Sequence, residues 1–132
     1  MLSHVHVGVS DFPRSYAFYS ALFEVLGLEL RFHQPERFWA GWGAAATERP
    51  LFFIGLPFDR QPARSGNGHM TAFLATTRDV VDRCHAAALA KGGSCAGLPG
   101  LRPQYHAYYY GTYFRDPDGN KICVCCHKQP AP

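Results

Sequence analysis

Apolar and polar residues alternate over the first ten positions of the chain. Val5, Val7 and Val9 fall on one face of an extended segment, whereas His4 and His6 fall on the other face. A period of two is typical of a strand that packs on one side only. We therefore predict a strand over residues 2–10, with its three valines turned toward a helix.

The pattern then changes to that of a helix. Ser10 and Asp11 are N-cap candidates, Pro13 suits a first helical turn, and Gly27 stops the apolar run. We predict a helix over residues 14–27. Three further strand-like runs complete the first half of the chain, at 28–33, 37–42 and 51–57. The first half therefore has the order βαβββ.

The second half repeats this order after a stretch of turn formers at residues 62–68. We predict a strand over 69–75, with Met70, Ala72 and Leu74 toward the helix and His69 and Phe73 on the opposite face. The remaining predicted elements are a helix at 78–93 and strands at 94–97, 105–115 and 121–127, the last two joined by an Asp-Pro-Asp-Gly turn.

These patterns predict an α+β fold for a single domain spanning residues 1–132. Module one covers 1–64 and module two covers 65–132, and each is βαβββ. Two such modules form a curved, partly open barrel of mixed sheet with the helices outside. Its concave interior is a natural pocket for a small molecule.

Two histidines occupy equivalent places in the repeat. His4 immediately precedes the first predicted helix-facing residue of its strand, and His69 does the same in the second module. Both imidazoles are therefore expected in the shared cavity, where they suit a metal site. The alternative is that each is a polar residue at the mouth of a strand.

Composition and charge argue against several classes of function. The chain has 132 residues and a formal net charge of +3, with no run of like charges, so a nucleic-acid surface is not indicated. No apolar run reaches the length of a membrane span, and no signal-peptide pattern opens the chain, so we expect a cytoplasmic protein that binds no membrane. Five cysteines, three of them within residues 123–126, favour reduced thiols over a disulfide framework.

Two segments carry a family resemblance. HVHVGVSDFPRSYAFYSALFEVLGLEL in the first half and YYYGTYFRDPDGNKICVCCH in the second resemble the vicinal oxygen chelate superfamily, which contains glyoxalase I, bleomycin-resistance proteins and extradiol dioxygenases. The resemblance implies the paired-module fold and a divalent metal that is chelated by adjacent oxygens of a substrate. It also implies a homodimer.

The metal ligands that the resemblance implies fall on four positions. They are His4, Gly55, His69 (or Met70 in the neighbouring register) and Cys123. Gly55 has no side chain, so the implied metal set is His4, His69 and Cys123. A thiolate ligand favours zinc over iron, manganese or nickel.

Three hypotheses for function stay open. The first is a glyoxalase- or dioxygenase-like enzyme, a metal-dependent lyase or isomerase acting on a substrate with adjacent oxygens. The second is a metal-free small-molecule binding protein of the bleomycin-resistance type. The third is thiol chemistry, with Cys123 as a catalytic nucleophile activated by a nearby histidine. The residues expected to line the ligand pocket are His6, Trp42, Phe53, Phe73, Tyr105, His106 and Tyr109.

Overall fold

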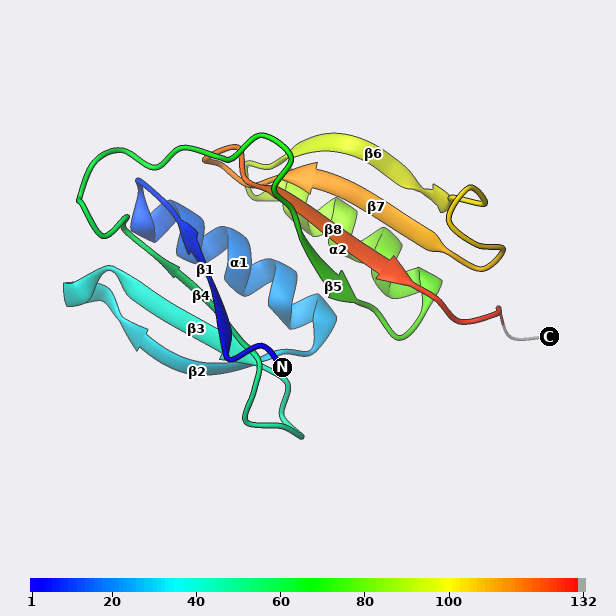
Figure 1. Ribbon diagram of the computed structural model, residues 1–132, viewed down its shortest axis with the longest axis horizontal. Helices are drawn as coiled ribbons and strands as arrows, with labels where there is room; N and C mark the ends of the chain where they lie inside the picture. The colour runs from blue at the N-terminus through cyan, green and yellow to red at the C-terminus, as the bar shows by residue number, and fades with distance from the viewer. Residues whose placement is uncertain (131–132) are drawn as a thin grey trace.

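Two βαβββ modules follow one another along the chain, as predicted (Figure 1). The structure is a computed structural model that describes residues 1–130. The last two positions of the predicted second module, 131 and 132, lie outside the described residues. The first module contains β1 (His4–Gly8), α1 (Phe12–Leu26), β2 (Glu29–Gln34), a short 3₁₀ turn (Pro35–Arg37), β3 (Trp39–Gly43) and β4 (Leu51–Gly55). The second contains β5 (Thr71–Leu74), α2 (Arg78–Ala90), β6 (Ser94–Leu101), β7 (Tyr110–Arg115) and β8 (Lys121–Cys126).

Both helices begin next to the predicted caps, and α1 ends at the predicted stop, whereas α2 ends at Ala90, three residues before the predicted end at 93. The Asp11 carboxylate accepts a hydrogen bond from the Arg14 backbone N–H at 3.1 Å and caps α1. Gly27 ends that helix in the left-handed conformation, with φ of 78°. Thr77 caps α2 through its hydroxyl, which accepts from the Val80 N–H at 3.2 Å. Local sequence therefore fixes both helix starts.

Each module forms its own four-stranded mixed sheet. The strand orders are β1-β4-β3-β2 and β5-β8-β7-β6, with the first pair in each sheet parallel and the others antiparallel. The two sheets do not close into a barrel. Both helices lie on the same side of the sheets, behind them in Figure 1, and α1 packs against α2. Each sheet thus has one helix-covered face and one uncovered face, which we call the open face.

One continuous core fills the helix side of both sheets. The Phe23 ring of α1 lies at its centre and contacts Trp42 and Phe52 of the first module and Phe73 of the second, with ring centroids 5.0–5.3 Å apart. The fully buried side chains around it include Val9, Phe18, Tyr19, Leu22, Ile54, Val81, Phe114, Ile122 and Val124. The two modules therefore share a hydrophobic core.

The orientation predicted for the strand over 69–75 is wrong. Phe73 pairs with Val124 in the parallel ladder, and both side chains lie in the core. Leu74 pairs with Cys125 on the open face and is 72% exposed. Because side chains alternate along a strand, Met70 and Ala72 fall on the same side as Leu74.

The helix caps explain this register. Val9 lies two residues before the cap Asp11, and Ala75 lies two residues before the cap Thr77; both are buried. Counting back from the caps makes Met70, rather than His69, the equivalent of His4. His69 precedes β5 and lies in the turn that connects the modules.

The turn over residues 116–120 is hydrogen-bonded to α1 and to the end of β1. Asp118 accepts hydrogen bonds from the Ser10 N–H at 3.0 Å and from the Ser15 hydroxyl at 3.2 Å. The buried Asp116 accepts from the Tyr19 hydroxyl at 2.6 Å. Asn120 donates to the Gly8 carbonyl at 3.0 Å. These contacts join residues about a hundred positions apart, so the turn orients β8 relative to the first module.

The predicted strand over 105–115 is shorter than expected. Residues 105–109 form turns, in which the Tyr105 N–H donates to the Arg102 carbonyl and the Tyr109 N–H donates to the His106 carbonyl. β7 begins only at Tyr110. Within residues 1–130, no helix is long and apolar enough to span a membrane.

Candidate functional site

The open face of the first sheet is aromatic and carries two histidines. The His4 ring stacks on Phe53 with centroids 4.8 Å apart, and its Nδ1 lies 2.8 Å from the Ser3 hydroxyl. Phe53 also contacts the rings of Phe32 and Trp39. This face therefore offers a flat apolar surface bordered by imidazole groups.

His6 lies beside this aromatic surface and is partly buried. Burial lowers the pKa of His6, and the nearby His4 lowers it further, so both effects favour the neutral ring. A β-carbon built on Gly55 would lie 3.0 Å from His6 Nε2. The imidazole thus occupies the space beside the position where the family resemblance places a carboxylate. His6 also lines cavities of about 250 and 590 Å³.

The open face of the second sheet carries thiols and phenols. Cys123 and Cys125 of β8 lie opposite Tyr113 and Gly111 of β7. The Tyr109 ring covers Gly111, because a β-carbon there would lie 2.8 Å from that ring. From this position the Tyr109 hydroxyl reaches Cys123 Sγ at 3.4 Å and the Tyr113 hydroxyl at 3.0 Å.

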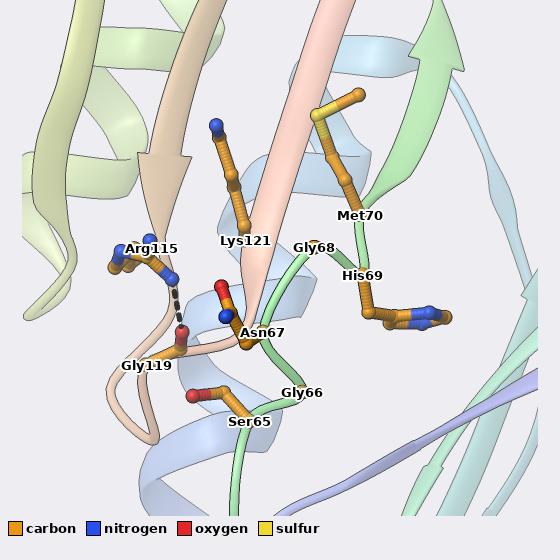
Figure 2. Close-up of a pocket in the computed structure, with 9 residues that line it drawn as sticks. All are labelled: Ser65, Gly66, Asn67, Gly68, His69, Met70, Arg115, Gly119 and Lys121. Atoms are coloured by element: carbon orange, nitrogen blue, oxygen red, sulfur yellow. Dashed lines mark hydrogen bonds between the residues drawn. The ribbon is translucent and has the colours of Figure 1, made fainter.

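A cavity of about 710 Å³ lies at the other end of this sheet. Arg115 and Lys121 supply two positive charges, and no carboxylate lines the cavity. Figure 2 shows Arg115 and Lys121 projecting from neighbouring strands beside the segment that joins the modules. The complete lining is Ser65, Gly66, Asn67, Gly68, His69, Met70, Arg115, Gly119 and Lys121. We call it the cationic pocket.

The polar groups of the cationic pocket do not all point the same way. Figure 2 shows the Ser65 hydroxyl on the side of Arg115 and Gly119, whereas the His69 ring points away from Lys121. One guanidinium nitrogen of Arg115 donates to the Gly119 carbonyl at 2.9 Å, which fixes the side chain and leaves its other N–H groups available. The Lys121 ammonium lies 5.4 Å from the Tyr113 ring centre.

Two residues expected in the ligand pocket belong to the core instead. Trp42 is buried against Phe23, on the helix side of β3. Phe73 packs between Phe23 and Phe52. These contacts place Trp42 and Phe73 on the helix side of their sheets and not on the open faces, because large aromatic rings gain most where other rings surround them. Trp42 is buried and Phe73 is partly buried, and both line a cavity of about 250 Å³.

The other expected pocket residues divide between the two open faces. His6 and Phe53 lie on the first sheet. Tyr105 and His106 lie in the turns before β7, and each ring contacts Tyr109 edge to face, with centroids 5.0 and 5.8 Å away. Within one chain these residues form two groups.

His4, His69 and Cys123 are not brought together within one chain. Over residues 1–130, no group of three His, Cys, Asp or Glu side chains is placed to hold a metal ion. His4 lies on the first sheet, His69 lies in the connecting turn, and Cys123 is buried under Tyr109. The three residues do not fit a shared metal in this arrangement.

Backbone pairing identifies a different cysteine as the counterpart of Gly55. The Val9 N–H donates to the Gly55 carbonyl at 2.9 Å, and the Ala75 N–H donates to the Cys125 carbonyl at 2.8 Å. Val9 and Ala75 are the equivalent residues of the two modules, so Cys125 is equivalent to Gly55. The alternation of Cys123, Cys125 and His127 along one strand was visible in the sequence, but their partners in the preceding turn were not.

Sequence reasoning also missed the cationic pocket. Arg115 and Lys121 flank the Asp-Pro-Asp-Gly turn at paired positions of β7 and β8. This pairing across the predicted hairpin could have indicated from the sequence that the two cations lie side by side. Their proximity to Ser65 and Asn67 depends on the path of the connecting segment, which no local pattern indicates.

Comparison with known proteins agrees with this architecture. Residues 1–124 match the family model described as the Glyoxalase/Bleomycin resistance protein/Dioxygenase superfamily. The chain belongs to this superfamily. The family resemblance drawn from the sequence is thereby confirmed. No curated protein sequence matches the chain.

Solved structures of the superfamily resemble the chain over nearly its whole length. A glyoxalase/bleomycin resistance protein from Albidiferax ferrireducens T118 is 38% identical, with a TM-score of 0.81, and the match covers 98% of this chain and 99% of that one. A glyoxalase-related enzyme from Fulvimarina pelagi is 20% identical, with a TM-score of 0.72 and coverage of 96% and 87%. A lactoylglutathione lyase from Agrobacterium tumefaciens is 19% identical, with a TM-score of 0.62 and coverage of 96% and 92%. The last two likenesses show the fold alone.

Proposed function

We propose that this superfamily member binds a small organic anion that carries adjacent oxygen atoms. The observation that supports this proposal is the cationic pocket, where Arg115 and Lys121 line about 710 Å³ of space and none of the other lining residues is a carboxylate. A guanidinium donates to two oxygens at once, and an ammonium adds a second charge close by. A carboxylate next to a hydroxyl or carbonyl group matches this arrangement.

The function proposed is therefore that of a metal-free small-molecule binding protein of the bleomycin-resistance type. A lyase or isomerase acting on the same class of molecule would use the same anion site. Binding is the step common to both, and it is the one to measure first.

Calorimetric titration with oxalate and lactate tests the proposal, with glycerol as a neutral control. R115Q and K121Q should each weaken binding about 10- to 100-fold, since a hydrogen bond to a charged group contributes about 1.5–3 kcal/mol. K91Q, at an exposed position after α2, is the matched control and should bind as the wild type does. Equal affinities for wild type, R115Q and K121Q would reject the cationic pocket as the anion site.

We also propose that the protein is a homodimer in which a second copy covers the open faces. Leu74 and Met70 are exposed beside Cys125 on the second sheet, and apolar side chains in such a position are stabilised by a partner surface. Sedimentation equilibrium should give a mass near twice the 14.7 kDa of one chain. L74E, which places a charge on this surface, should give the mass of one chain, whereas E36Q on the 3₁₀ turn should not change the mass.

A further inference from the structure

A second cavity, of about 250 Å³, lies between the two modules, and the proposed anion binding does not use it. Val5, Trp42 and Phe52 line it from the first module. Thr71 and Phe73 line it from the second module. We call it the boundary cavity.

The walls of the boundary cavity lie on the helix side of the sheets. Trp42 is buried against Phe23 of α1, with ring centroids 5.0 Å apart. The Phe73 ring lies 5.1 Å from Phe23 and 5.1 Å from Phe52, measured between centroids. Thr71 precedes Phe73 by two residues in β5, so the two side chains share a face. These walls are therefore not part of the open faces.

The boundary cavity is accessible from one end of the first sheet. Leu2, Ala44, Thr47 and Pro50 line it there, and all four are exposed. Figure 1 shows the N-terminus and the loop between β3 and β4 at this same end of the molecule. The Arg31 guanidinium donates to the Thr47 carbonyl at 2.6 Å and also to the Ala44 carbonyl, which holds the loop in place. A small molecule can therefore enter from solvent.

The chemistry of the lining selects an uncharged ligand. None of the described residues that line the boundary cavity carries a charge. Burying a charge without a partner is costly, so ions are excluded. An apolar cavity of roughly 150 Å³ binds benzene. The boundary cavity, at about 250 Å³, accommodates one aromatic ring with a small substituent, and the rings of Trp42, Phe52 and Phe73 offer edge-to-face contacts.

Thr71 adds a polar group to these apolar walls. It is partly buried and lines the cavity from the second module. Within residues 1–130, the threonine hydroxyls that form hydrogen bonds are those of Thr77 and Thr112. The Thr71 hydroxyl is therefore available to a ligand, and it can donate as well as accept.

We propose that the boundary cavity binds a small neutral aromatic alcohol, whose hydroxyl pairs with that of Thr71. The ligand ring contacts Trp42 and Phe52 of the first module and Phe73 of the second. The site differs from the cationic pocket in its residues and in its ligand class, because the cationic pocket favours negative charge.

Three ligands that share one aromatic ring test the proposal. Benzyl alcohol has the hydroxyl, toluene lacks it, and benzoate carries a charge in its place. Each is titrated into the isotope-labelled full chain at neutral pH, and NMR follows the indole N–H signals of Trp42 and Trp39, which W39F assigns. Trp39 contacts Phe53 on the open face and serves as an internal control.

Benzyl alcohol should shift the Trp42 signal in a saturable way, because an aromatic ligand changes the ring-current field beside it, and the Trp39 signal should stay in place. Toluene should bind about 2- to 10-fold more weakly, since it lacks the hydrogen bond to Thr71. Benzoate should leave the Trp42 signal unchanged.

The variant T71V removes the hydroxyl and keeps the shape of the side chain. It should weaken the binding of benzyl alcohol about 2- to 10-fold and leave the affinity for toluene unchanged. T76V, at an exposed position outside the cavity, is the matched control and should bind both ligands as the wild type does.

Three outcomes would overturn the proposal. The first is a Trp42 signal that benzyl alcohol does not shift. The second is a shift by benzoate as large as the shift by benzyl alcohol, since the lining would then not select neutral ligands. The third is an equal loss of affinity for toluene and benzyl alcohol in T71V, which would make the effect of Thr71 one of shape. Anion binding at Arg115 and Lys121 is measured with other ligands and other variants, so failure of either proposal is distinguishable from failure of the other.

Discussion

The hydrogen bond between Tyr19 and Asp116 gives the sharpest test of how the two modules are held together. Both side chains are buried, and the Tyr19 hydroxyl donates to the Asp116 carboxyl at 2.6 Å. Burial raises the pKa of Tyr19, and Asp116 raises it further, so the phenol keeps its proton and remains the donor. Tyr19→Phe removes the hydroxyl and keeps the ring.

The expected loss of unfolding free energy follows from the hydrogen bonds that Asp116 keeps in Y19F. Asn120 still donates to Asp116 from its side chain at 2.9 Å, and the Asp118 and Asn120 backbone N–H groups still donate at 2.9 Å. One hydrogen bond to a carboxylate is lost, which costs about 1.5–3 kcal/mol of unfolding free energy. For a chain of this length, that corresponds to a decrease in Tm of about 5–15 °C.

Urea unfolding followed by circular dichroism measures this effect. Tyr16→Phe is the matched control, since its ring stacks on His33 and its hydroxyl makes no hydrogen bond within the described residues. The control should change the unfolding free energy by less than about 0.5 kcal/mol. If Y19F and Y16F unfold at the same urea concentration, the hydrogen bond does not hold the turn on α1 and the reasoning is refuted.

Three further predictions concern the turn, the sheet and pH. D118A should lower the unfolding free energy by about 1–3 kcal/mol in urea, because the Ser15 hydroxyl loses its acceptor; D118N should recover part of this. G41A should cost about 1–3 kcal/mol, because its β-carbon would lie 2.7 Å from the Phe53 ring. Burial lowers the pKa of His6, so the unfolded chain binds this proton more readily, and stability should fall as pH drops from 7 to 5. H6Q should show a smaller fall.

The controls for these three predictions come from the same assays. G43A is not a neutral comparison for G41A, because its β-carbon would meet Leu51. G8A, in β1, is better suited, since its β-carbon would lie 3.5 Å from its nearest neighbour, the Pro57 ring, which is an ordinary van der Waals contact. For the pH series, equal losses of stability in wild type and H6Q would show that groups other than His6 cause the decrease.

The sequence by itself determined the order of the elements and the capped starts of the two helices. Alternating valines predict β1, and the caps Asp11 and Thr77 with the stop at Gly27 place the helices where the structure has them. These signals are local: a cap acts through hydrogen bonds within one turn, and a period of two is set by the strand backbone. The repeat of these signals also determined the paired-module fold.

The tertiary structure decided which side chains meet, and it settled the face that each residue of β5 presents, which the spacing from the Thr77 cap also indicates. Phe73 lies on the helix side because Phe23 and Phe52 offer it a place in the core, and this choice makes Met70 the counterpart of His4. The hydrogen bond between His106 and His127, and the contact of His127 with Cys125, depend on how the turns before β7 fold back over the sheet. Packing and long-range hydrogen bonds are set by the whole chain at once, so a pattern of a few residues cannot specify them.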